Sequence, residues 1–196
     1  MRRGIFGGTF NPVHHGHLCL AEEAWFHAGL DELTFIPNNR PPHKDNPEVT
    51  AEVRYQMLLA ATEGVAHFSV SRVELEREGP SYTYDTLMTF EPSDDLVFVC
   101  GADAFNAPWH KLPEVVDRLD QVLIAHRAGY PVAVPAQLQS LSSEQQKKIS
   151  LMPFPEIAIS SSLIRKRRAT GQAHRFLIPG PVYRIITKSD LYSVKN

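Results

Sequence analysis

Short apolar runs alternate with stretches of helical periodicity along most of this chain. Because parallel strands buried on both faces appear as near-continuous apolar runs, six such runs predict strands. They cover residues 4–6, 33–37, 68–71, 96–100, 121–125 and 149–152. Helical spacing and capping residues predict helices that begin near residues 16, 50, 83, 144, 160 and 180. The alternation predicts an α/β fold, a Rossmann-like, doubly wound and mainly parallel sheet with helices on both faces.

Composition narrows the class of protein. With 196 residues, of which 43% are hydrophobic and 21% charged, the chain fits a single domain over residues 1–196. Its formal net charge of −2 gives no overall attraction for nucleic acid, so we expect no polynucleotide partner. No apolar run is long enough to span a bilayer and no export signal is evident, which makes the cytoplasm the expected location. Cys19 and Cys100 lie in apolar segments and are expected to pack as small core residues.

The stretch with the most chemistry joins the first strand to the first helix, and it reads Gly7-Gly8-Thr9-Phe10-Asn11-Pro12-Val13-His14-His15-Gly16-His17. The two leading glycines allow the backbone to approach a ligand closely. A helix that opens near Gly16 directs N–H groups and the positive end of its dipole toward the same point. The histidine rings add further N–H donors. We therefore expect an anion here, with ordinary loop chemistry as the alternative.

A proline-rich loop follows the second strand at residues 38–47 and brings Arg40, His43 and Lys44 close together. Three such donors could reach a phosphate, and a solvated surface turn is the alternative. The charged stretch 72–79, which includes Glu74, is expected to be a solvated connection.

Further candidate binding residues lie in the middle of the chain. Ser81 or Thr83 can cap a short helix, and the first N–H groups of that helix could receive a small carboxylate. Asp103, just past the most apolar run, could accept hydrogen bonds from ribose hydroxyls or cap the next helix. Trp109 offers a flat platform for a planar ring, unless it packs in the core.

Three consecutive serines, Ser160, Ser161 and Ser162, precede a helical pattern that places Arg165 one turn in. Serines are favoured N-caps, so this helix start predicts a second anion site. The alternative is a capped amphipathic helix with a basic, solvated face.

Taken together, these motifs resemble those of a known family. The glycine–histidine stretch closely resembles the signature of the nucleotidyltransferases that use a His-x-Gly-His motif. A second motif of these nucleotidyltransferases resembles Ile159-Ser160-Ser161-Ser162-Leu163-Ile164-Arg165, where Ser162 replaces the usual threonine. Two further motifs resemble those of the bacterial nicotinate-nucleotide adenylyltransferases, namely Pro41-Pro42-His43-Lys44 and Ser81-Tyr82-Thr83-Tyr84-Asp85-Thr86-Leu87. The resemblance spans essentially the whole chain.

The resemblance implies transfer of an adenylyl group from ATP to nicotinate mononucleotide, which gives nicotinate adenine dinucleotide and pyrophosphate in NAD biosynthesis. It implies Mg²⁺ carried mainly by the ATP phosphates, with no metal site made of protein side chains. The implied catalytic residues are His17, His14, Arg165 and Lys44. The implied ATP-binding residues are Gly7, Gly8, Thr9, Phe10, Gly16, Gly101, Asp103, Ser160, Ser161 and Ser162. The implied nicotinate mononucleotide-binding residues are His43, Ser81, Tyr82, Thr83, Tyr84 and Trp109.

Several alternatives stay open at this point. The acceptor could be nicotinamide mononucleotide, because an acid and an amide differ by one group. Another adenylyltransferase or cytidylyltransferase would share the His-x-Gly-His stretch, and a non-catalytic nucleotide-binding domain is the alternative from a different class. The sequence does not decide between a monomer and a homo-oligomer. A P-loop is not indicated, because the chain contains no Gly-Lys pair.

Overall fold

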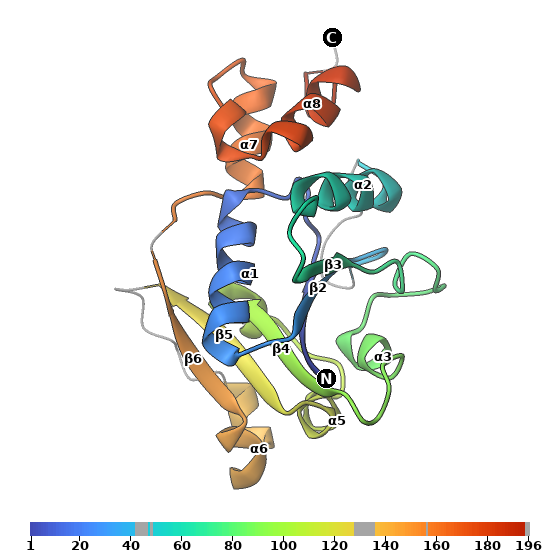
Figure 1. Cartoon of the computed structure of the whole chain (residues 1–196), viewed down its shortest axis with the longest axis vertical. Coiled ribbons are helices and arrows are strands. Elements are labelled where there is room, and N and C mark those ends of the chain that lie inside the picture. The colour runs from blue at the N-terminus through green and yellow to red at the C-terminus, as the bar shows by residue number, and fades with distance from the viewer. Residues whose placement is uncertain (42–46, 48, 128–135, 156, 195–196) are drawn as a thin grey trace.

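Six parallel strands form one sheet at the centre of the computed structural model (Figure 1). The structure describes residues 1–41, 47, 49–127, 136–155 and 157–194. The strand order is β3-β2-β1-β4-β5-β6, and each pair of neighbours is parallel. The strands are β1 (Arg2–Gly8), β2 (Glu32–Pro37), β3 (Phe68–Val70), β4 (Asp95–Gly101), β5 (Gln121–Arg127) and β6 (Ile149–Phe154). The predicted strands and their parallel arrangement are confirmed.

Helices pack on both faces of this sheet. The helices are α1 (His15–Ala28), α2 (Ala51–Thr62), α3 (Thr83–Leu87), α4 (Ala102–Phe105), α5 (Leu112–Arg118), α6 (Ser143–Lys147), α7 (Ser161–Ala169) and α8 (Gly180–Lys188), with 3-10 turns η1 (Ala136–Ser140) and η2 (Arg175–Leu177). Buried residues of α1, α2, α7 and α8 belong to one hydrophobic core, and those of α3, α4 and α5 belong to another. In Figure 1, α7 and α8 lie together at one end of the molecule, beside α2. The doubly wound fold is confirmed.

The central strand β4 shows how the sequence builds two cores. Successive side chains of a strand point to opposite faces. Val97 and Val99 accordingly pack in the core with α1, whereas Phe98 and Cys100 pack in the core with α5. A strand covered on both faces needs apolar residues at every position, which is why this segment is the most apolar run of the chain.

The strand order also locates the place where a ligand can bind. Going outward from the centre of the sheet, the order runs β1-β2-β3 on one side and β4-β5-β6 on the other. In open α/β sheets a crevice forms at the carboxyl ends of the strands where the order reverses. Here these ends are Gly8 of β1 and Gly101 of β4. The glycine–histidine stretch therefore lies at the switch point of the sheet.

Helix ends follow the capping residues at most predicted positions. Gly29 ends α1 in the left-handed conformation with φ 58°, and the Thr50 hydroxyl accepts a hydrogen bond from Val53 N at the start of α2. The short helix α3 departs from the prediction, because Tyr82 is its N-cap and no side chain caps it. The alternatives Ser81 and Thr83 were therefore both wrong as N-caps.

One of the two cysteine predictions is wrong. Cys100 is buried in β4, as expected. Cys19 is exposed, since α1 turns Ala21 and Ala24 toward the core and Cys19 away from it. In the part of the chain that the structure describes, no helix is both long enough and apolar enough to cross a membrane.

Candidate active site

Two adjoining cavities open at the carboxyl edge of the sheet. The larger has a volume of about 750 Å³ and the smaller about 230 Å³. Gly7, Gly8 and Thr9 line both of them, so the end of β1 forms their common wall. Two ligands held in these cavities would meet at the glycine loop.

The larger cavity collects most of the residues predicted for catalysis and ATP binding. The predicted residues in its lining are Gly7, Gly8, Thr9, Phe10, His14, Gly16, His17, Gly101, Ser160, Ser161, Ser162 and Arg165. Residues that are up to 158 positions apart in the sequence thus share one site, because the parallel topology brings the ends of their strands to the same edge.

The glycines of this wall have different structural roles. A Cβ on Gly7 or Gly101 would meet nothing within 4 Å, so both backbones stay open to a ligand. A Cβ on Gly8 would lie 2.9 Å from the ring of Phe10. Phe10 is 2% exposed and adopts φ 48°, which turns its ring under the loop and into the core. Gly8 therefore shapes the loop by making room for Phe10.

The two histidines form one stacked unit at the start of α1. His14 is the N-cap of the helix and His17 occupies the third helical position. The backbone N–H of His14 donates to Nδ1 of His17 at 3.2 Å, and the ring centroids lie 3.7 Å apart. In a capping box, a glutamate at the third helical position accepts a hydrogen bond from the N-cap backbone, and here the imidazole of His17 does so. A Cβ on Gly16 would lie 3.1 Å from Nδ1 of His14, so glycine leaves space for the stacked rings.

This arrangement determines which nitrogen of His17 can donate. A ring nitrogen that accepts a hydrogen bond does not carry the proton, so neutral His17 is protonated at Nε2. Burial lowers the pKa of His17 well below its ordinary value of 6.5, and the charge of His14 lowers it further. His17 therefore presents a neutral N–H donor in the larger cavity at pH 7.

The lowered pKa of His17 predicts a loss of stability in mild acid. In the unfolded chain His17 titrates near 6.5, whereas in the folded chain it stays neutral to lower pH. Unfolding below pH 6.5 therefore takes up a proton, and this residue alone lowers the free energy of unfolding by up to about 1.4 kcal/mol per pH unit. We expect urea denaturation of His17→Gln to show a shallower loss of stability between about pH 6.5 and 5 than the parent chain shows. Equal slopes would contradict the assignment.

The start of α7 also lines the larger cavity, through Ser160, Ser161, Ser162 and Arg165. Ser160 caps the helix, since its Oγ accepts from Leu163 N at 3.2 Å, as predicted. The hydroxyl of Ser161 donates to the carbonyl of Pro12 at 2.9 Å, and Nη1 of Arg165 donates to the carbonyl of Asn11 at 2.8 Å. These two bonds join α7 directly to the glycine–histidine stretch.

A buried arginine of α2, to which the sequence analysis gave no role in the site, holds the same loop. Arg54 on α2 is 1% exposed, and its guanidinium donates to the carbonyls of Thr9 at 2.7 Å, Asn38 at 2.6 Å and Val49 at 3.3 Å. It thereby joins the loop after β1 to the loop after β2. Its helical spacing alone gave no sign of this role, because its partners are carbonyls of other segments.

Apolar lining residues of the larger cavity were also missed by the sequence analysis. They include Leu20, Ala125, Phe154 and Ile157, and Ile159, which had been quoted only as part of a motif, lines the cavity with them. An apolar wall beside polar donors is the usual composition of a site for a small organic ligand. The larger cavity therefore suits a ligand with one anionic and one planar, apolar part.

The smaller cavity contains most of the residues predicted for the second nucleotide. Ser81, Tyr82, Thr83 and Trp109 all line it. Tyr84 does not, because its ring packs beside the second core and lies under the ammonium group of Lys111. The prediction for Tyr84 is therefore not supported by the geometry.

Ser81 acts on a neighbouring loop and does not cap α3. Its Oγ accepts hydrogen bonds from the backbone N–H groups of Asn39 at 3.0 Å and Arg40 at 3.2 Å. The hydroxyl thus joins the segment before α3 to the loop after β2. Both segments border the smaller cavity, through Ser81 itself and through Asn38.

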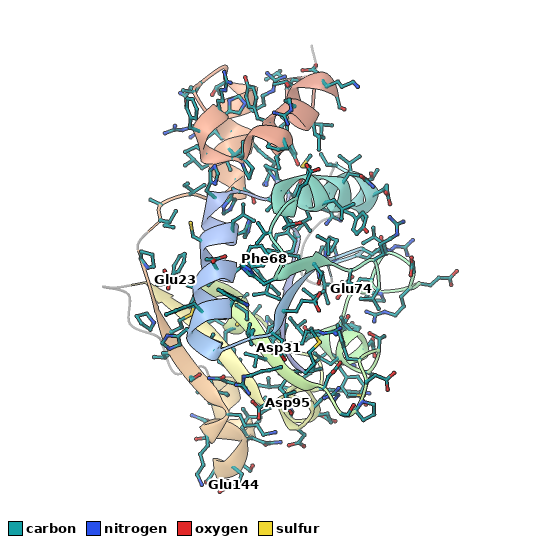
Figure 2. All side chains as sticks on the ribbon, viewed as in Figure 1. Glu23, Asp31, Phe68, Glu74, Asp95 and Glu144 are labelled. Atoms are coloured by element: carbon teal, nitrogen blue, oxygen red, sulfur yellow. The ribbon has the colours of Figure 1, made fainter. Side chains whose placement is uncertain are left out.

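Glu74 contradicts the expectation of a solvated connection between β3 and α3. It is 4% exposed, and Figure 2 labels it on that connection. Its carboxylate accepts from Nδ2 of Asn38 at 3.1 Å and from the hydroxyl of Thr86 at 2.7 Å. A buried carboxylate needs such partners. Both partners lie outside the stretch 72–79, so the charge pattern of this stretch gave no sign of them. Glu74 lines the smaller cavity.

Trp109 both packs against the core and lines the smaller cavity, which were the two alternatives for it. Its Nε1 donates to the carbonyl of Phe105 at 2.9 Å, and its ring meets the edge of Phe98 with centroids 5.4 Å apart. The residue is partly exposed and lines the smaller cavity. His110 beside it lies 4.4 Å from the ring of Tyr82, centroid to centroid. These rings form an aromatic wall suited to a planar ligand.

Three predicted residues lie outside the described part of the structure, namely His43, Lys44 and the side chain of Asp103. The residues that flank the first two are described. Pro41 lines the smaller cavity and Pro47 lines the larger one.

The charges of the larger cavity favour an anion. Its described lining contains Arg165, the two histidines and several hydroxyls, and no carboxylate. Within the described ranges, no three His, Cys, Asp or Glu side chains group closely enough to hold a metal ion. The arrangement can hold a polyphosphate and donate hydrogen bonds to it as charge develops.

The fold and this site define a class of enzyme, the Rossmann-like nucleotidyltransferases with a His-x-Gly-His motif. A family model described as cytidylyltransferase-like matches residues 5–167. The chain is 39% identical to "Nicotinate-nucleotide adenylyltransferase" of Bacillus subtilis, with 96% of this chain and 97% of that protein covered. It is 41% identical to "Probable nicotinate-nucleotide adenylyltransferase" of Carboxydothermus hydrogenoformans, with 96% of each covered. The chain belongs to the nicotinate-nucleotide adenylyltransferase family.

Solved structures support the fold independently. A Plasmodium falciparum nicotinic acid mononucleotide adenylyltransferase, solved in complex with NaAD, superposes with a TM-score of 0.75 over 97% of each chain at 19% identity. A second structure of a P. falciparum enzyme of this name, in complex with APC, gives a TM-score of 0.73. At this level of identity the similarity concerns the fold.

Proposed function

We propose that this enzyme transfers the adenylyl group of ATP to nicotinate mononucleotide and releases pyrophosphate. The observation that carries the proposal is the pair of cavities that share Gly7, Gly8 and Thr9. One cavity has an anion-binding wall and an apolar wall, and the other has an aromatic wall. Such a pair suits two nucleotides whose phosphates meet at the common wall.

The reaction needs little from the protein beyond placement and charge. A phosphate oxygen of the mononucleotide attacks the α-phosphorus of ATP, a new P–O bond forms, and the bond to the β-phosphate breaks as pyrophosphate leaves. The nucleophile is already an anion, so no general base is required. Catalysis then rests on holding two polyanions in line and on stabilising the charge that grows on the leaving group.

The donors of the larger cavity are assigned to these tasks. His17 and His14 stabilise the transferring and leaving phosphates, and Arg165 and Ser161 bind the triphosphate. Lys44 is assigned to a phosphate near the junction. Support comes from the places of His14, His17, Ser161 and Arg165 in the lining of one cavity. For Lys44 the support is the resemblance of Pro41-Pro42-His43-Lys44 to the family's motif.

In the smaller cavity we assign the pyridine ring to the aromatic wall of Trp109, and its carboxylate to the first turn of α3. The first N–H groups of a helix have no partner within the helix, and their dipole favours a negative charge. Thr83, the first residue of α3, lines the cavity. Mg²⁺ is proposed as the cofactor, because it binds phosphates and water more readily than an all-protein cage.

The test is an assay of pyrophosphate release with ATP, Mg²⁺ and either nicotinate or nicotinamide mononucleotide. We expect kcat/KM for pyrophosphate release to be at least about tenfold higher with nicotinate mononucleotide than with nicotinamide mononucleotide, which corresponds to about 1.4 kcal/mol. A preference for the amide would overturn the choice of acceptor. Binding of ATP without release of pyrophosphate in the presence of either mononucleotide would indicate a non-catalytic nucleotide-binding protein.

A further inference from the structure

The C-terminal turn of the chain reaches the glycine–histidine stretch from far along the sequence. Tyr192 lines the larger cavity, and its hydroxyl donates a hydrogen bond to Oδ1 of Asn11, 181 residues away. Asn11 lines the same cavity. The ring of Tyr192 also packs against the core that contains α1, α2, α7 and α8, so the phenol joins this core to a residue of the site.

The backbone around Tyr192 is built to hold the phenol in this place. Tyr192 has φ 60° and Asp190 has φ 46°, a left-handed conformation that side chains rarely adopt. Nη2 of Arg168 donates to the carboxylate of Asp190 at 2.7 Å, and the hydroxyl of Ser193 donates to the same residue at 2.9 Å. Strained conformations of this kind persist where surrounding contacts enforce them, and they cluster at functional sites.

Three other side chains donate hydrogen bonds to backbone carbonyls of the stretch that Tyr192 contacts. Arg54 binds the carbonyl of Thr9, Arg165 that of Asn11, and Ser161 that of Pro12. The hydrogen bond from Tyr192 differs from these three, because it fixes the Asn11 side chain. Without it the Asn11 amide can rotate within the cavity, next to the guanidinium of Arg165.

The phenol is a dependable donor at neutral pH. Burial raises the pKa of Tyr192 far above its ordinary value, while the charges of Arg165 and Arg54 oppose this in part. The hydroxyl therefore keeps its proton and donates it to the amide oxygen.

We propose that Tyr192 is a positioning residue for ATP, which acts by fixing the Asn11 side chain and the adjoining part of the glycine–histidine stretch. The inference rests on the proposed function for its substrate. It assigns a role to the C-terminal turn, which contributes no residue to the smaller cavity. The effect should accordingly fall on ATP and spare the mononucleotide.

The first test is Tyr192→Phe, which removes one hydroxyl and keeps the ring. Loss of one hydrogen bond in a part-buried site predicts a Kd for ATP that is raised about fivefold to tenfold, measured by calorimetry without the mononucleotide. The KM for ATP should rise similarly and the KM for nicotinate mononucleotide should stay within about twofold. Tyr183→Phe on α8 is the matched control, because Tyr183 lines neither cavity, and it should bind ATP like the parent chain.

A double-mutant cycle distinguishes positioning from a general loss of structure. Asn11→Ala removes the acceptor, so adding Tyr192→Phe to it should weaken ATP binding no further. Additive effects, an unchanged Kd for Tyr192→Phe, or an equal loss for both substrates together with a lower melting temperature would each overturn the proposal. Because the Kd for ATP is measured without turnover, an enzyme that fails to use nicotinate mononucleotide would refute the proposed function and still leave this test intact.

Discussion

Replacing His17 by alanine is expected to lower kcat for adenylyl transfer about 100-fold to 1000-fold, with less than about threefold change in the Kd for ATP. The reason is the geometry of the stacked histidines. The backbone N–H of His14 engages Nδ1 of His17, which leaves Nε2 as the donor in the cavity. A donor that meets charge only as it develops stabilises the transition state more than the bound substrate. Steady-state kinetics and calorimetry on the same variant measure the two effects separately.

His15 provides the control for this experiment. His15 lies two residues before His17 in the sequence and lines neither cavity. His15→Ala should retain at least about half of the parent kcat if only placement in the cavity matters. If His17→Ala and the parent chain turned over at the same rate, His17 would have no part in the chemistry. A large loss of ATP affinity with unchanged kcat would make it a binding residue only.

Replacing Arg165 by alanine should lower kcat/KM for ATP about 100-fold to 1000-fold, with contributions from both KM and kcat. In the described lining of the larger cavity Arg165 is the only lysine or arginine. The substitution removes its charge and also the bond from Nη1 to the carbonyl of Asn11. Arg165→Lys should recover only part of the loss, because an ammonium group keeps the charge but lacks the planar fork of donors.

Lys166 offers the matched control, since it is the next residue of α7, is exposed and lines neither cavity. Lys166→Ala removes the same charge from the same helix and should change kcat/KM for ATP less than about twofold. Equal losses in Arg165→Ala and Lys166→Ala would show a general effect of the basic helix and would contradict a specific role for Arg165.

Much of the fold could be predicted because its signals are local. Apolar runs such as 96–100 mark strands buried on both faces, and Gly29, Thr50 and Ser160 mark helix ends through their own backbone or hydroxyl chemistry. Helix α5 was not predicted, since its seven residues are too few for a periodic signal. The convergence of distant motifs on one edge followed from the parallel topology.

The supporting contacts of the site could not be predicted, because their partners are distant in sequence. Arg54 lies in a predicted helix and Glu74 in a stretch that was expected to be solvated. Their partners are carbonyls, an amide and a hydroxyl of other segments, which neither local pattern reveals. Tyr192 reaches Asn11 across almost the whole chain. Cys19 shows the opposite error: its apolar neighbours predicted burial, but its side chain lies on the exposed side of α1. Local sequence patterns indicate the chemistry available to a side chain, whereas the tertiary fold determines its hydrogen-bond partners and its burial.

A crystal structure with nicotinate adenine dinucleotide bound would test the central claim most directly. We expect the adenosine to lie in the larger cavity against its apolar wall, and the pyridine ring to lie against Trp109. The two phosphates should then lie against the common wall at Gly7, Gly8 and Thr9. A product that lies in the opposite orientation, or that leaves either cavity empty, would contradict the account.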